Sequence, residues 1–317
     1  MNMKRFAMPS LLAVAVVAMS FSYDASAQQP PQDRRGLRQP VYRVAQAQPA
    51  PVRQATAQQP VRNEQPQAQQ EEHPLAPMVA RANELIKHMD ENVQDYSATL
   101  VKRERVDGVL NGHQYIYTKI RHEQKNERGA VVEPFSVYMN FQAPDEVKGR
   151  EVIYVEGENG GNLIAHDGGV GLLAQLKASV TVSLDPESPR AMKGNKYPIT
   201  SVGMKNLMKK LIVVATESMK HDECEVKLFP KVKVNGRVCT CMQSVHPVPR
   251  DHFKFHIARI YVDDELQMPI RYESYGWPTR EGQDPPLLEE YTYVNVKLNN
   301  GFTDRDFDKS NGNYRFN

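Results

Sequence analysis

The pattern of apolar and polar positions divides the chain into three parts. Residues 11–19 form a short apolar run behind Lys4 and Arg5, and residues 28–72 are rich in Gln, Pro, Ala and Arg with few large apolar residues. From residue 73 to residue 317, apolar positions recur with the periods of helices and strands. We therefore expect one folded domain over residues 73–317, preceded by two segments of a different kind.

The folded part is predicted to alternate helix, strands, helix, strands. A first helix is predicted because apolar residues recur at helical spacing, at Met78, Ala82, Leu85, Ile86 and Met89. A second helix is predicted to follow a cap at Pro198–Ser201. Its apolar face is predicted to carry Met204, Leu207, Met208, Leu211, Ile212, Ala215 and Met219.

The strands are predicted from period-two alternation. Phe135, Val137, Met139 and Phe141 alternate with Ser136, Tyr138 and Asn140, which is typical of a half-buried strand. Further strands are expected at 96–104, 114–121, 151–156, 162–166, 180–184, 225–234, 237–245, 256–262, 270–275 and 288–298. Long antiparallel sheet with two segregated helices predicts an α+β fold.

The N-terminal residues predict export. Lys4 and Arg5, the apolar run and the small-x-small sequence Ala25-Ser26-Ala27 follow one another in the order of a secretory signal peptide over residues 1–27, cut after Ala27. The run is too short to span a bilayer as an anchor, because a spanning helix needs roughly 20 apolar residues. We expect a protein of the periplasm or the extracellular space that is not an integral membrane protein.

Residues 28–72 are expected to form a disordered linker, because so polar a segment cannot bury enough surface to offset its ordering entropy. A weak tether to the cell wall or an anionic surface through its arginines is the alternative. The formal net charge of +2 lacks the basic excess of a nucleic-acid binder, so no nucleic-acid partner is expected.

The three cysteines permit a disulfide in an oxidising compartment. Cys239 and Cys241 are two residues apart, so a bond between them would be strained. Cys224 with Cys239 or with Cys241, across neighbouring strands, has the better geometry, and the odd count leaves one thiol over.

Few residues point to catalysis or to a metal. The cysteines lack paired C-x-x-C spacing, and His252 and His256 are four apart on an expected strand, where they would be far from each other. The glycines at 157–161 and 168–169 lack the Lys-Ser/Thr ending of a phosphate loop. We therefore expect no enzyme, metal or cofactor. A hydrolase using His166, Asp167 or His252 is the least favoured hypothesis.

Several segments, in order, resemble one exported bacterial family. They are Lys148–Gly157, Asn195–Gly203, Asn235–Cys239 with His246-Pro247, Tyr275–Pro278, Leu288–Asn299, Phe302–Phe307 and Asn311–Phe316. Together they resemble the family called domain of unknown function 1571, over roughly residues 75–317. That family is similar in layout to the LolA/LolB-like lipoprotein carriers. The resemblance implies a strongly curved antiparallel sheet, a half-barrel, with helices covering its concave face.

The resemblance also implies an activity, which is holding acyl chains of a lipid or an acylated protein between sheet and helices. Candidate cavity residues are the apolar positions of one strand and two helices: Leu85, Met89, Phe135, Val137, Met139, Phe141, Met204, Leu207, Met208 and Leu211. Methionine suits irregular apolar partners, although the same residues could simply pack a core. The alternative function is an envelope interaction or sensor module that binds a peptide or another envelope protein in the same groove.

Overall fold

The computed structural model describes residues 72–168 and 180–316. The predicted signal peptide, with its cut after Ala27, and nearly all of the predicted linker at 28–72 lie outside these described residues. The boundaries proposed for those segments, and for a domain over 73–317, therefore stay predictions.

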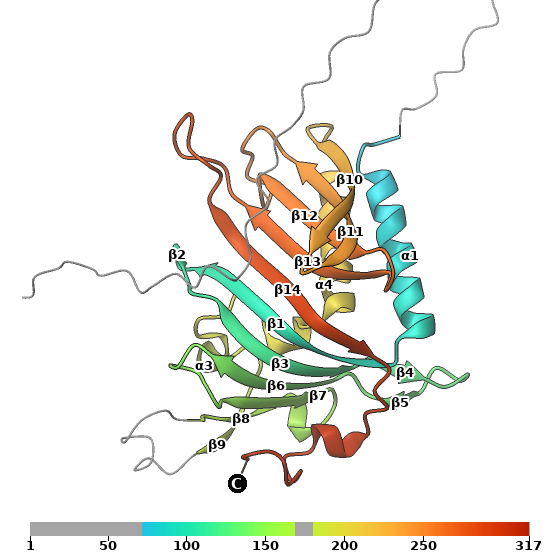
Figure 1. Cartoon of the computed structure of the whole chain (residues 1–317), viewed down its shortest axis with the longest axis vertical. Coiled ribbons are helices and arrows are strands. Elements are labelled where there is room, and N and C mark those ends of the chain that lie inside the picture. Colours follow the sequence, from blue (N-terminus) through green and yellow to red (C-terminus); the bar gives the residue numbers. More distant parts are fainter. Residues whose placement is uncertain (1–71, 169–179, 317) are drawn as a thin grey trace, which may run out of the picture. The chain divides into compact units, whose positions relative to one another are not determined.

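One antiparallel sheet of twelve strands forms the body of the described domain, in the order β10-β11-β12-β13-β14-β1-β3-β6-β7-β8-β9, with β2 beside β1 (Figure 1). The strands are β1 (Asp95–Val106), β2 (Val109–Leu110), β3 (Gln114–Arg121), β6 (Ser136–Ala143), β7 (Glu151–Val155), β8 (Leu163–His166), β9 (Thr181–Leu184), β10 (Glu225–Val234), β11 (Arg237–Val245), β12 (Ile257–Asp263), β13 (Met268–Tyr275) and β14 (Leu287–Leu298). A separate hairpin consists of β4 (Gln124–Lys125) and β5 (Val131–Glu133). The sheet is open, because β10 and β9 do not pair with each other.

Two long helices, α1 (Ala76–Asn92) and α4 (Met204–Ser218), pack against each other beside the β10–β13 part of the sheet (Figure 1). Leu85 and Met89 of α1 and Met204 and Met208 of α4 are fully buried in the main core. An ion pair between Lys205 and Asp90 joins the helices. Short helical turns occur at α3 (Pro189–Met192), η1 (Asn159–Gly161), η2 (Ile199–Ser201) and η3 (Asp304–Phe307).

The start of α4 differs from the expected cap at Pro198–Ser201. Residues Ile199–Ser201 form η2, and α4 begins at Met204 after Gly203, which has φ 111°. The Met204 amide donates to the hydroxyl oxygen of Tyr96 at 2.9 Å, so a strand of the sheet supplies the cap that we sought in the local sequence. Gly203 suits this place because its φ is positive and a Cβ there would meet that hydroxyl at 3.2 Å.

The sheet curves strongly around an interior space. Residues of β9 and of β13 line the same cavity, although these strands are seven places apart in the sheet order. A flat sheet would separate them by about 34 Å, since neighbouring strands lie about 4.8 Å apart. The α+β fold, with an open half-barrel and helices against one face, is thus the fold expected from the sequence.

The expectation of a half-buried strand at residues 135–141 is wrong. Val137, Met139 and Phe141 are buried on the inner face of β6, but Ser136 and Tyr138 are buried as well. The C-terminal segment covers the outer face, where it forms a second core with Tyr138. The other buried members of that core are Ile153, Val155, Ile164, Phe307, Tyr314 and Phe316.

Asp95 anchors the start of this C-terminal segment. Its carboxylate accepts hydrogen bonds from the backbone amides of Asn300, Gly301 and Phe302 at 2.6–3.0 Å. Further on, Arg121 pairs with Asp304 at 2.8 Å and Lys119 with Asp306 at 2.7 Å. These contacts hold residues 300–316 against the outer face of β3, β6 and β7.

The expected disulfide is absent, and its absence follows from strand register. Cys224, Cys239 and Cys241 are free and buried. Glu225 pairs with Val245 and Phe229 with Cys241, so Cys224 lies about five positions, or roughly 16 Å, from Cys241 along the hairpin. A disulfide needs Cα atoms within about 7 Å. Burial raises the pKa of Cys224 to about 11 and that of Cys241 to about 12, so both thiols stay protonated.

Candidate functional site: an internal cavity with an apolar and a polar end

A cavity of about 1200 Å³ lies between the inner face of the sheet, the helix α4 and the segment that joins α3 to α4. This volume exceeds the roughly 300–1,000 Å³ of typical small-molecule sites. The cavity is therefore large enough for a long flexible ligand, and the fold leaves it unfilled by side chains of the described residues.

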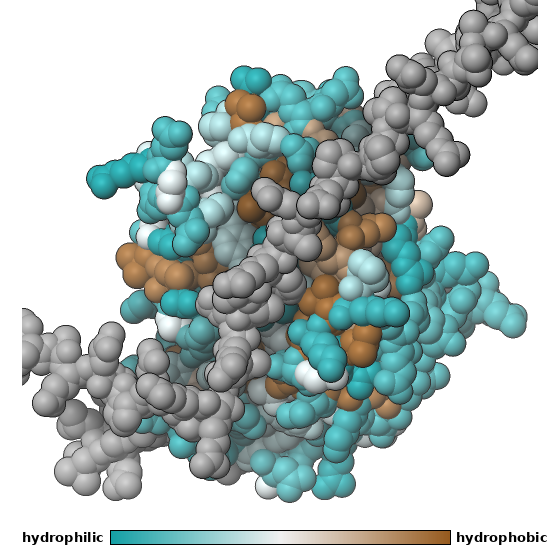
Figure 2. All heavy atoms as spheres, turned by 45° about the horizontal axis from the view of Figure 1, so that its top comes forward, coloured by the Kyte–Doolittle hydropathy of each residue, from teal (hydrophilic) through white to brown (hydrophobic). Residues whose placement is uncertain are grey.

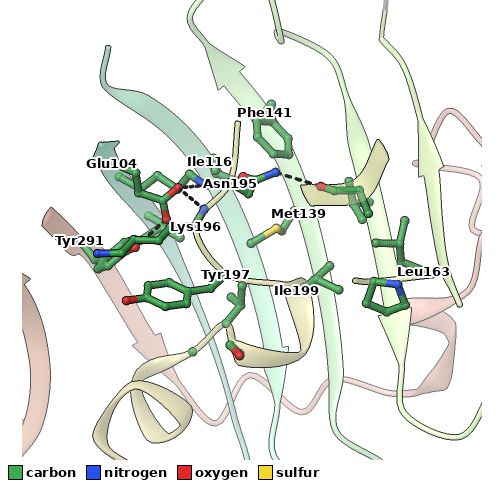
Figure 3. Close-up of a pocket in the computed structure, with 18 of the residues that line it drawn as sticks. Glu104, Ile116, Met139, Phe141, Leu163, Asn195, Lys196, Tyr197, Ile199 and Tyr291 are labelled. Carbon is green, nitrogen blue, oxygen red and sulfur yellow. Dashed lines mark hydrogen bonds and ion pairs between the residues drawn. The ribbon is translucent and has the colours of Figure 1, made fainter. Parts of the chain in front are cut away.

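Apolar side chains form one end of the cavity, where the strands β3, β6, β7 and β8 provide the wall. Figure 3 shows Met139, Phe141 and Leu163 pointing into this end, with Ile199 of η2 opposite the sheet. Leu207, Leu211 and Val214 of α4 complete the apolar lining. The only charged or hydrogen-bonding side chains at this end among the described lining residues are Arg150, His166 and Asp167 at the β7–β8 edge, so burial would supply most of the binding energy for a ligand there.

Two glutamates organise the polar end. Glu104 of β1 and Glu289 of β14 are cross-strand partners on the inner face, and they are 3% and 4% exposed. Like charges directly opposite each other destabilise a sheet unless other groups compensate them. Two lysines compensate the negative charges of these carboxylates. The Lys102 ammonium lies 3.1 Å from the Glu104 carboxylate, and the Lys196 ammonium lies 2.9 Å from the Glu289 carboxylate.

Tyrosines and a serine supply the remaining donors to these carboxylates. The Tyr291 hydroxyl donates to Glu104 at 2.6 Å, and Ser274 donates to Glu289 at 3.1 Å. Burial, with the two carboxylates next in importance, raises the pKa of Tyr291 far above its usual value, so the hydroxyl remains a proton donor. Both carboxylates are thereby fully hydrogen-bonded, as buried charges must be.

The segment Asn195–Tyr197, here called the strap, is fixed to the sheet through this network (Figure 3). The Lys196 amide donates to Glu104 at 3.1 Å, Lys102 donates to the Asn195 side chain at 2.6 Å, and the Tyr197 hydroxyl donates to Glu289 at 3.3 Å. The strap thus lies at the polar end of the cavity, where it is hydrogen-bonded to β1 and β14.

The predicted cavity residues are divided between the cavity and the core. Met139, Phe141, Leu207 and Leu211 line the cavity. Met208 borders, with Leu211, a much smaller space of about 40 Å³ between α1 and α4. Leu85, Met89, Val137, Met204 and the half-buried Phe135 belong to the main core. A ligand contact stays a prediction for all ten.

The polar end was missed in the sequence. Lys102 and Glu104 lie in a run, Leu100 to Val106, in which both strand faces carry charged residues, so alternation does not reveal which face is buried. Glu289 and Glu290 pose the same ambiguity, although Glu289 faces inward and Glu290 pairs with Arg271. A usable signal was the alternation of Glu289, Tyr291 and Tyr293, because two tyrosines on the same face indicate burial.

The residues considered for hydrolysis do not form a catalytic group. His166 and Asp167 lie at the β8 edge of the cavity, but Asp167 pairs with Arg150 at 3.3 Å and the nearest polar contact of His166 is Thr181 Oγ1 at 3.4 Å. His252 stacks on His221 and is not part of the cavity wall. Within residues 72–168 and 180–316, no cluster of His, Cys, Asp and Glu could hold a metal ion.

The chain matches one known protein family over most of the described residues. The profile of the family described as "Protein of unknown function (DUF1571)" matches residues 93–316. The chain belongs to this family. No match was found among curated proteins. The DUF1571 assignment agrees with the resemblance found in the sequence, and no helix in the described part of the chain is long and apolar enough to cross a membrane.

Among solved structures, the DUF1571 chain is distantly similar to several proteins, including the following three. The lipoprotein LppX of Mycobacterium tuberculosis is 12% identical, with a TM-score of 0.38 and coverage of 74% of this chain and 100% of LppX. A DUF1329 family protein of Desulfovibrio piger is 13% identical (TM-score 0.36; 75% and 98% covered). A LolA superfamily protein of Nitrosomonas europaea is 10% identical (TM-score 0.27; 72% and 97% covered). Similarity this low carries no argument about function, so the function has to be inferred from the geometry of this chain.

Proposed function

We propose that this DUF1571 protein is an exported, non-enzymatic binding protein that holds the acyl chains of a lipid or an acylated protein. The observation that carries the proposal is the cavity of about 1200 Å³ with an apolar end between the curved sheet and α4. Export is supported by the signal-peptide pattern of residues 1–27.

The energetics favour an acyl chain as occupant. Each buried methylene contributes about 0.8 kcal/mol, so a long chain gains on the order of 10 kcal/mol before the costs of binding. The apolar end has the aliphatic, aromatic and thioether side chains that such a chain needs, represented by Leu163, Phe141 and Met139.

The alternative is a module that binds a peptide or another envelope protein in the same groove, and the experiment below separates it from acyl binding. Binding of a peptide strand outside the groove is disfavoured at one of the two free edges of the sheet, β10, where Pro230 lacks an N–H and a bulge interrupts the register between Phe229 and Val232. Figure 2 shows a face that is largely hydrophilic, with apolar side chains gathered in patches. These features favour the internal cavity over an external docking surface.

The first experiment is native mass spectrometry of residues 28–317, purified without detergent from an exporting host. We expect co-purifying masses that organic solvent releases and that are identified as acyl lipids or acylated peptides. A protein that stays ligand-free after incubation with phospholipid and acylated peptide would overturn the proposal. Specific capture of a non-acylated envelope protein by such a ligand-free chain would favour the interaction module.

A matched pair of variants on α4 locates the site. Leu207 lines the cavity, whereas Val213 on the same helix is 63% exposed to solvent and does not. We expect Leu207→Asp to weaken the affinity for a fluorescent fatty-acid probe at least tenfold, because a carboxylate in the wall opposes chain burial. Val213→Asp should bind like the parent, and circular dichroism checks that both variants are folded.

Since Leu207→Asp could perturb folding, Ala165→Trp offers a second approach. Ala165 lines the apolar end, and an indole there would occupy space that the chain needs. Equal probe affinity in the parent and in both cavity variants would exclude this cavity as the acyl site.

A further inference from the structure

The charges of the cavity wall are strongly unbalanced. Three acidic residues line it, and each has a cationic partner: Glu104 with Lys102, Glu289 with Lys196, and Asp167 with Arg150. Four further cations line the same cavity, namely Arg190, Lys193, Lys210 and Lys254. None of these four forms an ion pair with any carboxylate among the described residues. The described residues therefore leave four cations of the wall, all of them exposed to solvent, without a carboxylate partner.

Three of the unpaired cations belong to the elements that form the polar end. Arg190 lies in α3 and Lys193 directly after it, just ahead of the strap. Lys210 of α4 reaches the strap from the other side, and its ammonium lies 3.6 Å from the centre of the Tyr197 ring. The Lys196 ammonium lies 5.6 Å from the centre of the same ring. Two ammonium groups, those of Lys196 and Lys210, thus lie beside Tyr197, and that of Lys210 has no carboxylate partner among the described residues.

Lys210 would gain an ionic partner from an anionic ligand. Partial burial lowers its pKa, and the positive charge of Lys196 adds to this effect while Glu289 opposes it. Glu289 already forms an ion pair with Lys196. An external anion would therefore be the ion-pair partner of Lys210.

We propose that the polar end of the cavity binds the anionic headgroup of an amphiphile, a carboxylate or a phosphate, with Lys210 contacting it and Lys193 and Arg190 completing the site. This inference rests on the proposed acyl-binding function and names the chemical class of its ligand. The chain lies among Met139, Phe141 and Leu163, and the headgroup lies at the strap.

The arrangement discriminates against neutral and cationic headgroups. The carboxylates of the wall are satisfied by protein donors, so they offer nothing to a choline or an ammonium group. The hydroxyl protons of Tyr197 and Tyr291 are donated to Glu289 and Glu104, so these hydroxyls have no donor left for a neutral sugar or glycerol. The unpaired cations are the groups left for recognition, and they select an anion.

The test compares ligands that share one chain. Displacement of a fluorescent acyl probe by oleate, by 1-oleoyl lysophosphatidic acid and by uncharged oleyl alcohol is measured at 50 and 500 mM salt. We expect one or both anions to bind about tenfold or more tightly than the alcohol at low salt, and this preference should shrink at high salt. Preference for oleate identifies a carboxylate, and preference for the lysophospholipid identifies a phosphate.

A matched pair of lysines assigns the site. Lys210→Gln should reduce the anion preference about tenfold and leave the affinity for oleyl alcohol unchanged. Lys209→Gln removes the same charge from the neighbouring position of α4, which does not line the cavity, and should keep the preference. The double variant Arg190→Gln/Lys193→Gln should reduce the preference further in the Lys210→Gln background.

The outcomes separate this inference from the proposed function. Equal binding of oleate, lysophosphatidic acid and oleyl alcohol, unaffected by Lys210→Gln, would overturn the headgroup site and leave acyl binding intact. Failure of all three ligands to displace the probe, or failure of the probe itself to bind, would overturn the acyl-binding function. Equal loss in Lys209→Gln and Lys210→Gln would show general surface attraction and would also overturn the site.

Discussion

At the scale of single residues, His122 shows how burial makes this domain sensitive to acid. Its ring is buried, the Nδ1 atom donates to the Val93 carbonyl oxygen at 2.9 Å, and the ring meets Tyr96 edge-on. Burial, followed by the positive charge of Lys205, lowers the pKa of His122 from its ordinary value of 6.5 to about 4. The folded state therefore favours the neutral imidazole.

We predict that the free energy of unfolding falls as the pH is lowered from about 6.5 to about 4. In this window the unfolded chain binds the proton of His122 and the folded chain does not, so stability is present above pH 6.5 and lost on acidification. The contribution of His122 is about 3 kcal/mol. Urea unfolding at several pH values should show a flatter pH dependence for His122→Asn, and an equally steep decline in that variant would refute this account.

Residue identity alone could not reveal the charged groups of the cavity. Lys102 and Arg103 are neighbours in β1, yet Lys102 lies in the cavity wall and Arg103 bonds the Asn111 carbonyl outside it. Their sequence environment is equally polar. Which of them is enclosed depends on β14 and on the strap, which approach β1 from positions roughly 90 or more residues away.

At the scale of elements, the sequence was informative about strands and helices but not about their partners. Asn235-Gly236 correctly predicted the hairpin of β10 and β11, because both residues adopt the positive φ that a tight turn of this type needs. The pairing register is a property of the whole ladder, and it placed Cys224 far from Cys239 and Cys241. The covered outer face of β6 was likewise hidden, since the residues that cover it lie at 302–316.

The C-terminal segment should stabilise the domain without touching the ligand. Tyr314 stacks on Tyr138 with ring centroids 4.1 Å apart, and its hydroxyl donates to the Asp306 carbonyl oxygen at 2.7 Å. We predict that Tyr314→Ala lowers the free energy of unfolding by about 3 kcal/mol, because it removes a buried aromatic ring from the second core. Urea denaturation measures this loss.

Binding should be unaffected in the same variant. Tyr138 and Tyr314 lie on the outer face of the sheet, opposite the Met139 and Phe141 side chains that line the cavity. The affinity of folded Tyr314→Ala for the acyl probe is therefore expected to equal that of the parent. A large loss of affinity would mean that the two faces of the sheet are coupled, and that the cavity depends on the C-terminal segment.

At the scale of the whole molecule, the open sheet explains why a cavity persists. Eleven consecutive strands curve around a space, but the packed pair α1 and α4 fills only the part beside β10–β13. Beside β3 and β6–β9 the cover consists of α3, the strap, η2 and one face of α4, and it leaves the cavity between itself and the sheet. The interior is thus a packed core on one side and a cavity on the other, and the ligand would take the place of missing core side chains.

A ligand that completes the core must stabilise the fold as a whole. Binding to the folded state alone adds about 2.7 kcal/mol at a free ligand concentration of one hundred times Kd. For a domain of this size, 1 kcal/mol shifts Tm by about 2–4 °C, so we predict an increase of about 5–10 °C with a saturating acyl ligand. Leu207→Asp should lose the shift, whereas Tyr314→Ala should keep it from a lower starting Tm. A ligand that binds but leaves Tm unchanged would have to bind the unfolded chain as well as the folded one, and this would contradict a site that the folded cavity alone provides.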